Sequence, residues 1–139
     1  AKPVDIGAVM EGQTAGEVVS SRAPGFAPGD TVLGGFGWQR FSAVPAARLF
    51  KVDPDEAPLS ASLGVLGMPG LTAWVGLEDI GQPKAGETVV VSAASGAVGQ
   101  VVGQIAKIRG CRVVGVAGGR AKCDFVTGEL GFDASVDHR

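Results

Sequence analysis

The strongest constraint on this chain is a regular alternation of strand-like and helix-like segments in its second half. Buried-strand and helical patterns follow one another in the order Thr88–Ser92, Ala97–Arg109, Arg112–Ala117, Arg120–Leu130 and Ala134–Asp137. A strand, helix, strand, helix, strand order is typical of parallel strands joined by crossover helices in one sheet. We therefore predict an α/β fold in which this half forms part of a doubly wound parallel sheet.

The first helical segment carries an apolar stripe. Its members recur at helical spacing, and we expect all of them on the buried face: Val98, Val101, Val102, Ile105 and Ile108. Gly110 and Gly131 are expected to end the two helices, because glycine adopts the left-handed conformation that often follows a helix.

Residues before position 57 have a different pattern, with short strand-like runs separated by Pro and Gly turns. We predict strands at Gly16–Ser20, Thr31–Leu33, Arg40–Val44 and Leu49–Val52, as in a β-barrel or sandwich. Helical character follows in Ala57–Leu66 and Leu71–Ile80, with a break at residues 67–70 caused by one proline and two glycines. The predicted domains are residues 1–64 and 65–139.

Composition excludes several classes of partner and site. A net charge of −2 and a pI near 5.3 give no reason to expect nucleic acid or an anionic membrane as a partner. The chain has two long uncharged stretches, Ala61–Leu77 and Thr88–Ala106. Gly, Pro and polar residues interrupt both of them, so neither predicts a membrane span. Cys111, Cys123 and His138 are too few for a usual zinc shell. We expect no metal and two buried, reduced thiols, as in a cytoplasmic protein.

A glycine-rich turn lies between the predicted strand Thr88–Ser92 and the predicted helix Ala97–Arg109. Ala93–Gly99 reads AASGAVG, a variant of the G-x-G-x-x-G phosphate-binding pattern with Ala94 at the first glycine position. Gly96 would let a pyrophosphate approach the backbone, beside the amides of Ala97 and Val98 at the helix start. Gly99 would let the helix pack close to the strand. The alternative is a tight turn that serves packing alone.

The end of the next strand predicts which dinucleotide is bound. A site for NAD places Asp or Glu about 20 residues after the glycine motif, to bind the ribose 2′-hydroxyl. Here Ala117 is followed by Gly118, Gly119 and then Arg120 and Lys122, with no carboxylate. Two charge-assisted hydrogen bonds to a 2′-phosphate would favour NADP(H) on the order of a hundredfold. The alternative is that both cations merely solvate a helix start.

Beyond these patterns, the run from Gly64 to Cys123, with GMPGLTA followed by AASGAVG, resembles the zinc-independent medium-chain dehydrogenases/reductases. The similarity is greatest to the group of prostaglandin, alkenal/one and curcumin reductases. Residues 16–44 resemble the substrate-side, GroES-like barrel of the same enzymes. The resemblance implies a partial GroES-like barrel followed by the first half of a Rossmann domain. It also implies NADPH-dependent reduction of the carbon–carbon double bond of α,β-unsaturated ketones and aldehydes.

The resemblance also implies roles for individual residues. Gly96–Gly99 would line the pyrophosphate, and Lys122 beside Gly118 would bind the 2′-phosphate. Met68 and Thr72 lie in the segment near the nicotinamide, and His138 lies where some relatives have a tyrosine near the adenosine ribose. His138 is equally well explained as a surface residue at a strand end.

The sequence predicts no catalytic proton donor. Trp74 replaces the tyrosine that the family usually has after T-A, and the chain contains no tyrosine. We expect Trp74 to be a packing residue beside the cleft and not a catalytic one. Residues Gly35–Gln39 could face substrate, although packing explains Phe36 and Trp38 as well.

The resemblance leaves several expectations about the whole protein. The chain matches an internal part of a longer enzyme, for which the family implies a homodimer with a small enone or enal substrate. We expect the isolated chain to be poorly stable and inactive, because its sheets would have open edges. Quinone reduction, or NADP binding without catalysis, are the alternative functions.

Overall fold

The computed structural model describes residues 3–139. The chain divides into two compact units, with the boundary between Leu63 and Gly64.

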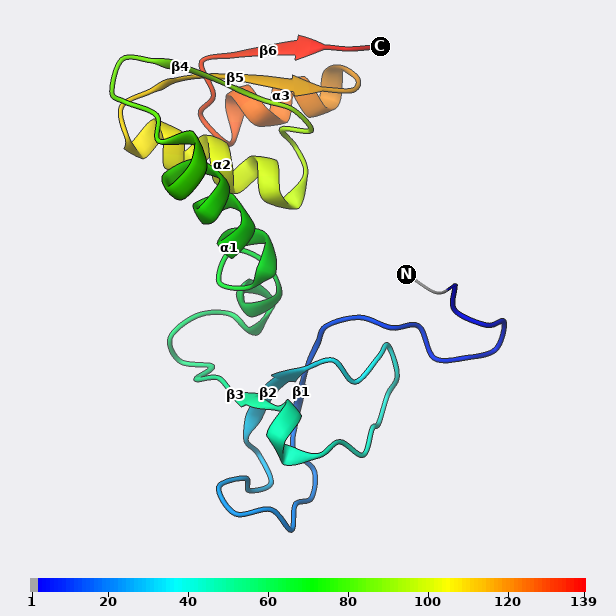
Figure 1. Cartoon of the computed structure of the whole chain (residues 1–139). Helices are drawn as coiled ribbons and strands as arrows, with labels where there is room; N and C mark the ends of the chain where they lie inside the picture. The colour runs from blue at the N-terminus through cyan, green and yellow to red at the C-terminus, as the bar shows by residue number, and fades with distance from the viewer. Residues whose placement is uncertain (1–2) are drawn as a thin grey trace. The chain divides into compact units, whose positions relative to one another are not determined.

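The first unit is built on a small antiparallel sheet. Its three strands have the order β1 (Thr14–Glu17), β2 (Thr31–Gly34) and β3 (Phe50–Lys51) (Figure 1). Two short 3-10 helices, η1 (Ala46–Arg48) and η2 (Leu59–Leu63), complete the unit. The strand predicted at 40–44 was wrong: no ladder pairing is found there within the described residues. Residues 57–66 contain only η2, where we predicted a helical segment.

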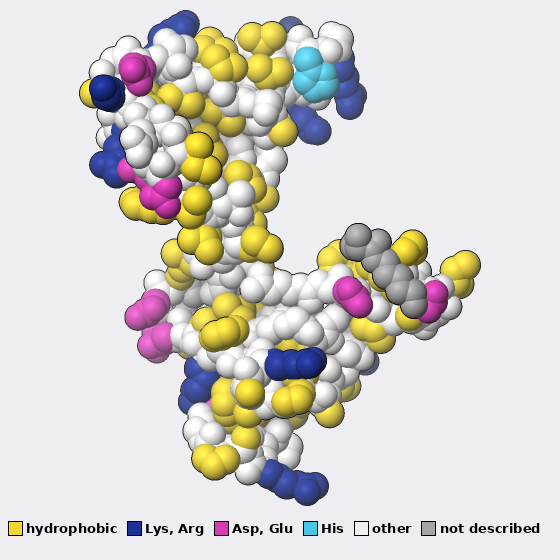
Figure 2. All heavy atoms as spheres, in the orientation of Figure 1, with side chains coloured by type: hydrophobic (Ala, Val, Ile, Leu, Met, Phe, Trp, Pro, Cys, Tyr) yellow, Lys and Arg dark blue, Asp and Glu magenta, His cyan; other side chains and the backbone are white. Residues whose placement is uncertain are grey.

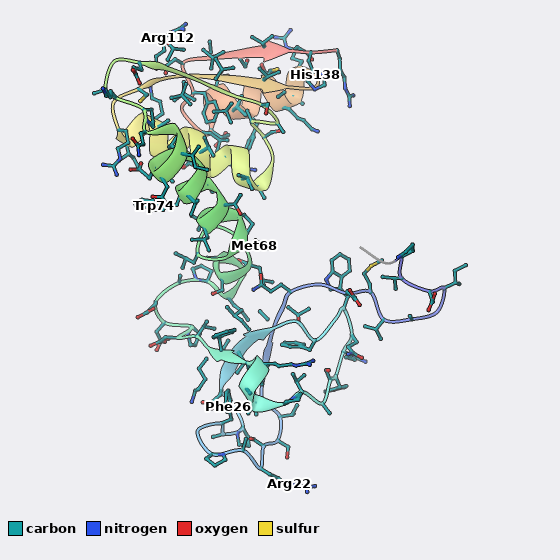
Figure 3. All side chains as sticks on the ribbon, in the orientation of Figure 1. Arg22, Phe26, Met68, Trp74, Arg112 and His138 are labelled. Atoms are coloured by element: carbon teal, nitrogen blue, oxygen red, sulfur yellow. The ribbon has the colours of Figure 1, made fainter. Side chains whose placement is uncertain are left out.

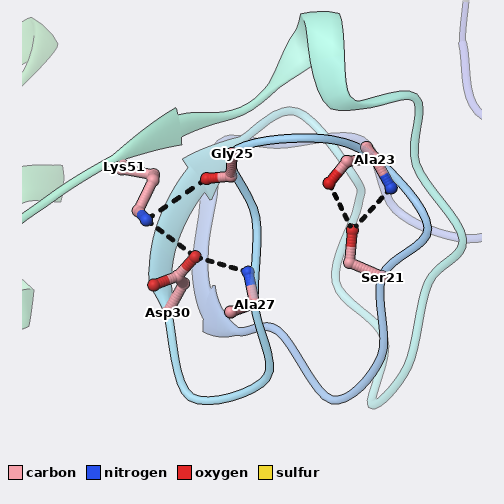
Figure 4. A network of polar contacts seen from close by, with 6 residues as sticks. All are labelled: Ser21, Ala23, Gly25, Ala27, Asp30 and Lys51. Atoms are coloured by element: carbon pink, nitrogen blue, oxygen red, sulfur yellow. Dashed lines mark hydrogen bonds and ion pairs between the residues drawn. The ribbon is translucent and has the colours of Figure 1, made fainter.

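A polar network holds the turn between β1 and β2 (Figure 4). Lys51 Nζ lies 2.8 Å from Asp30 Oδ2 and donates to the carbonyl of Gly25 at 3.3 Å. The amide of Ala27 donates to the same Asp30 oxygen at 2.7 Å. These bonds, that from Lys51 above all, hold the pKa of Asp30 below its usual value. The turn is thereby fastened to β3.

The second unit is the predicted α/β unit. Its elements follow in the order α1 (Met68–Trp74), η3 (Val75–Gly81), β4 (Thr88–Val91), α2 (Ala97–Ile108), β5 (Arg112–Ala117), α3 (Arg120–Gly128) and β6 (Ala134–Asp137). The strands pair in parallel in the order β4-β5-β6. Helices α2 and α3 cover the same face of this sheet, and α1 packs against α2 (Figure 1). The predicted alternation is confirmed.

The helix before β4 begins earlier than we predicted. Residues 68–70 belong to α1, because a proline in the first turn loses no hydrogen bond that the helix could have made. The helix then continues as η3, a π-helix over Val75–Gly81. Gln82, with a φ of 46°, ends it in the left-handed conformation. The last helix of the unit, α3, ends at Gly128, earlier than the predicted end at Leu130 before Gly131.

The buried face of α2 differs from the predicted one. Its buried residues are small, namely Gly99, Gly103 and Ala106, whereas Ile108 is 83% exposed. Val98 is 37% exposed, and only Val102 and Ile105 of the predicted stripe pack against the core. The reason is the close approach of α2 to its neighbours. A Cβ on Gly103 would lie 1.9 Å from Cζ of Phe132, which is itself buried.

We predict that Gly103→Ala destabilises the protein by about 1–3 kcal/mol, because an added methyl group overpacks a filled core. Gly128→Ala is the matched control: it is also helical, and a Cβ there meets nothing within 4 Å. Because alanine has the better helix propensity, this control should keep or raise stability. Urea denaturation of both variants measures the difference. Equal stability of the two variants would contradict the close packing of Gly103 against Phe132.

Candidate functional site

The candidate site lies at the carboxyl edge of the parallel sheet. Val91 pairs with Gly115, and Ala117 pairs with Asp137, so the three strands end close together. The segments that follow β4, β5 and β6 therefore share one edge, where ligands bind in open α/β sheets. Figure 3 shows His138 at this edge and Arg112 at the opposite end of the sheet.

The turn after β4 is held by backbone bonds and by one unusual conformation. Ala93 has a φ of 47°, in the left-handed region that favours glycine. The amide of Gly96 donates to the carbonyl of Ala93 at 2.8 Å. The amide of Ala94 donates to the carbonyl of Val116 at 3.0 Å, which ties the turn to β5. The residue with positive φ is therefore Ala93, one position before the one that replaces the first glycine of the motif.

A side chain of α2 braces the same turn. Gln100 Nε2 donates to the carbonyl of Ser95 at 2.8 Å, and the backbone amide of Gln100 donates to the carbonyl of Gly96 at 3.0 Å. Both bonds join the first turn of the helix to the residues in front of it. The turn is thus held by β5 through the amide of Ala94 and by α2 through Gln100.

The two glycines of the turn meet different surroundings. A Cβ on Gly99 would lie 2.5 Å from the carbonyl oxygen of Ala93, so close packing alone requires glycine there. Gly96 has an extended backbone, with φ −82° and ψ 166°, and a Cβ would meet only the Ala93 oxygen, at 3.1 Å. Packing therefore explains Gly99. The surface at Gly96 is otherwise open to an approaching group.

The start of α2 offers free hydrogen-bond donors. No side chain caps this helix, and its first turn contains no acidic residue. Within residues 3–139, the amides of Ala97 and Val98 have no protein acceptor. Free amides at a helix start, together with the positive end of the helix dipole, attract an anion. The predicted residues of the motif are thus brought together in one corner, with free hydrogen-bond donors at the helix start.

The loop after β5 brings the predicted cations to the same edge. Gly119, with a φ of 93°, precedes α3, and both Arg120 and Lys122 are exposed. Arg120 forms an ion pair with Asp124 at 3.5 Å, in which the side chains are 92% and 69% exposed. A pair this exposed contributes little to stability. Both cations thus stay accessible to an anionic ligand.

His138 lies against the same loop. Its backbone amide donates to the carbonyl of Ala117 at 3.1 Å, which continues the pairing of β6 with β5. A Cβ on Gly118 would lie 2.9 Å from Nε2 of His138, so the ring rests on that glycine. The residue is exposed, as the surface alternative required. It lies beside Arg139, against the loop that leads to Arg120 and Lys122.

Asp137 is the one acid that β6 brings to this edge. Its Oδ1 accepts from the amide of Gly119 at 2.8 Å and from the amide of Arg139 at 3.0 Å. These two bonds, followed by the charges of His138 and Arg139, hold the pKa of Asp137 below its usual value. The carboxylate therefore shapes the loop in front of α3.

Met68 and Thr72 lie elsewhere, on the first turns of α1. The Thr72 hydroxyl donates to the carbonyl of Met68 at 2.7 Å, and both residues are exposed. Because α1 packs against α2, they belong to an element in contact with the helix that follows the turn. Within the described part of the chain, no polar contact joins them to residues 93–99. Trp74, also on α1, is 49% exposed.

The structure also describes the two cysteines, the possible metal ligands and the lengths of the helices. Cys111 and Cys123 are buried free thiols, as predicted. Residues 3–139 contain no group of three or more His, Cys, Asp or Glu residues that could hold a metal ion. None of their helices combines the length and the apolar character that a bilayer crossing needs.

One hollow lies in the first unit. It has a volume of about 740 Å³ and is lined by β1 and by residues 39–44, among others. Phe36 lines it, whereas Trp38 is 69% exposed and lies against Gly12, where a Cβ would be 2.5 Å from the indole nitrogen. Of the two explanations for this segment, core packing does not hold for Trp38.

The sequence patterns did not predict the structural roles of three residues of the corner, namely Ala93, Gln100 and Asp137. No local pattern marks an alanine as left-handed. A glutamine four residues after a motif glycine is a usable signal, because one turn of helix returns its side chain to the helix start. Asp137 becomes part of the corner only through the pairing of β6 with β5.

The known proteins to which this chain is similar include several oxidoreductases. A family model described as the N-terminal domain of oxidoreductase matches residues 1–52. The chain is 57% identical over 136 residues to the NADPH-dependent curcumin reductase of Escherichia coli, covering 98% of this chain and 39% of that protein. It is 46% identical over 134 residues to the NADP⁺-dependent 2-alkenal reductase of Nicotiana tabacum, covering 96% and 39%.

A solved structure agrees over the whole length. CurA from Vibrio vulnificus, in complex with NADPH, has a TM-score of 0.90 and 48% identity, covering 100% of this chain and 41% of that one. This confirms the predicted fold class: part of a GroES-like barrel followed by the first half of a Rossmann sheet. The chain spans about two fifths of the length of the relatives it matches.

We predict that Ala93→Gly leaves stability unchanged or raises it. A left-handed alanine costs about 1–2 kcal/mol, which exceeds the roughly 0.5–1 kcal/mol that the freer unfolded glycine chain costs. Ala106→Gly, in the buried middle of α2, is the control and should lose about 1 kcal/mol or more. Urea denaturation checks both. A loss at position 93 as large as at position 106 would disprove the left-handed turn.

Proposed function

Because this chain belongs to the medium-chain dehydrogenases/reductases, in the zinc-independent group of curcumin, alkenal and prostaglandin reductases, we propose that it forms part of an NADPH-dependent enone reductase. The observation that carries the proposal is the corner at the carboxyl edge of the sheet. Free amides at the start of α2 and cations at the start of α3 share that edge.

The turn after β4 fits a pyrophosphate. Gly96 keeps the backbone bare, and the amides of Ala97 and Val98 are free donors beside it. Gln100 and Ala93 hold the turn in shape before a ligand arrives. Such preorganisation lowers the cost of binding, because few groups need to be ordered.

The loop after β5 fits the 2′-phosphate of NADP(H). Lys122 and Arg120 supply charge, and Gly118 lets the side chains of His138 and Arg139 lie against the same loop. The segment that follows β5, residues 118–122, contains no carboxylate that could bind an unphosphorylated ribose. Phosphate bound here would gain charge-assisted hydrogen bonds.

When bound, NADPH supplies the hydride that reduces a carbon–carbon double bond conjugated to a carbonyl group. The residues of this chain bind and orient. Thr72 gives its hydroxyl hydrogen to Met68, which leaves its exposed oxygen as an acceptor for an amide donor such as a carboxamide. The residues described assign no proton donor to the reaction.

We predict that Lys122→Glu weakens NADPH binding by about a hundredfold or more, since it removes one charge-assisted bond and adds a repulsive charge. NADH binding should change by less than about threefold, because NADH lacks the 2′-phosphate. Lys84→Glu is the matched control: it makes the same charge change at an exposed position before β4, away from the carboxyl edge. Titration of the intact protein with each cofactor measures the effect. Equal losses for the two cofactors would remove Lys122 from the 2′-phosphate site.

The reaction itself is tested by NADPH oxidation with panels of enones, enals and quinones. Turnover of enones or enals, with product reduced at the double bond, supports the proposal. Turnover restricted to quinones, or tight NADPH binding with no turnover on any of these, refutes it in favour of the alternatives.

A further inference from the structure

The only histidine of the chain lies against Gly118, beside Arg139, at the carboxyl edge of the sheet. We propose that His138 couples NADPH binding to protonation, so that the 2′-phosphate is bound more tightly as the pH falls and the imidazole gains its charge. This inference rests on the proposed function. It goes beyond it by giving the same site a pH response.

The backbone fixes where the imidazole ring lies. The amide of His138 is bonded to the carbonyl of Ala117, which extends the ladder between β5 and β6 by one residue. The ring then lies over Gly118, where an added Cβ would be 2.9 Å from Nε2 and 3.0 Å from Cε1, so that the ring would have to shift. The ring therefore borders the loop that leads into α3.

The ring nitrogens are available to a ligand. Within residues 3–139, neither nitrogen of the His138 ring forms a hydrogen bond. The residue is also exposed, so an incoming phosphate can reach it. A protonated imidazole is a donor at both nitrogens, whereas the neutral ring donates from only one.

Charged groups around the ring come from two elements. On the side of α3 these are Arg120 and Lys122, with Asp124 paired to Arg120. On the side of β6 they are Asp137 and Arg139. Figure 2 shows the histidine with basic side chains gathered at the same corner of the surface. The Asp137 carboxylate accepts hydrogen bonds from two backbone amides, and the charge of His138 helps to hold the pKa of Asp137 below its usual value.

The direction of the effect follows from charge. A phosphate monoester carries a charge of about −1.5 to −2 near pH 7. A charged imidazole beside it adds a charge-assisted hydrogen bond, and imidazole side chains change charge between about pH 5 and 8. The phosphate itself gains a proton near pH 6, which weakens its binding. The histidine and the phosphate therefore act in opposite directions below about pH 6.5.

The experiment compares wild-type protein with His138→Gln, which keeps a polar side chain and cannot titrate. Dissociation constants for NADPH and NADH are measured on the intact protein at pH 6.5 and pH 8.5. We expect wild-type protein to bind NADPH about tenfold more tightly at pH 6.5, the size of one charge-assisted bond. The variant should change less than about twofold, and NADH should show no pH effect attributable to position 138 in either protein.

A second measurement needs no variant. At pH 7.5 the phosphate monoester has lost its second proton, so proton uptake on binding reports on the protein. Calorimetry in buffers of different ionisation enthalpy should show more protons taken up with NADPH than with NADH by wild-type protein. This result decides the question even if His138→Gln fails to fold.

The outcomes separate this inference from the proposed function. If wild-type and variant proteins have the same NADPH profile against pH, or proton uptake is equal for the two cofactors, the proton coupling is wrong while NADPH binding stands. If wild-type protein does not prefer NADPH over NADH at any pH, the proposed function fails, and this inference fails with it.

Discussion

The close approach of α2 to the parallel sheet is the constraint on which the second unit depends. Gly99 lets the first turn of this helix lie against the carbonyl of Ala93, and Gly103 admits the ring of Phe132 beneath it. Larger residues at these positions would push the helix away from β4 and β5. Because the helix start is held at the edge of the sheet, its free amides stand where an anion can reach them. Packing and binding thus use the same turn.

Strand register decides which other groups reach that edge. Ala117 pairs with Asp137, so the loop into α3 and the tail after β6 lie side by side. The cations at the start of α3 are bound only weakly by the protein, because the pair of Arg120 with Asp124 is exposed. Asp137, the acid among them, is held by backbone amides. The result is a corner with a positive surface and a bare backbone beside it.

Much of the second unit followed from local patterns, and the errors have a common cause. Runs of β-branched residues correctly predicted β4 and β5, and the proline at position 69 lay in a first turn instead of a break. The apolar stripe mispredicted the buried face of α2, because periodicity counts apolar residues and not available space. The expected strand at 40–44 was wrong for a related reason: a strand needs a partner, and composition does not supply one.

The sequence by itself determined the strand and helix order, the glycines of the turn, and the absence of a carboxylate where Arg120 and Lys122 stand. These depend on neighbours a few residues apart, where backbone preference and periodicity act. Only the tertiary structure placed His138 on Gly118 and engaged Asp137 with Gly119. Those contacts join residues 18 or more positions apart, and they arise from the pairing of β6 with β5. Sheet register, which brings distant residues into contact, is not encoded in any short stretch of the chain.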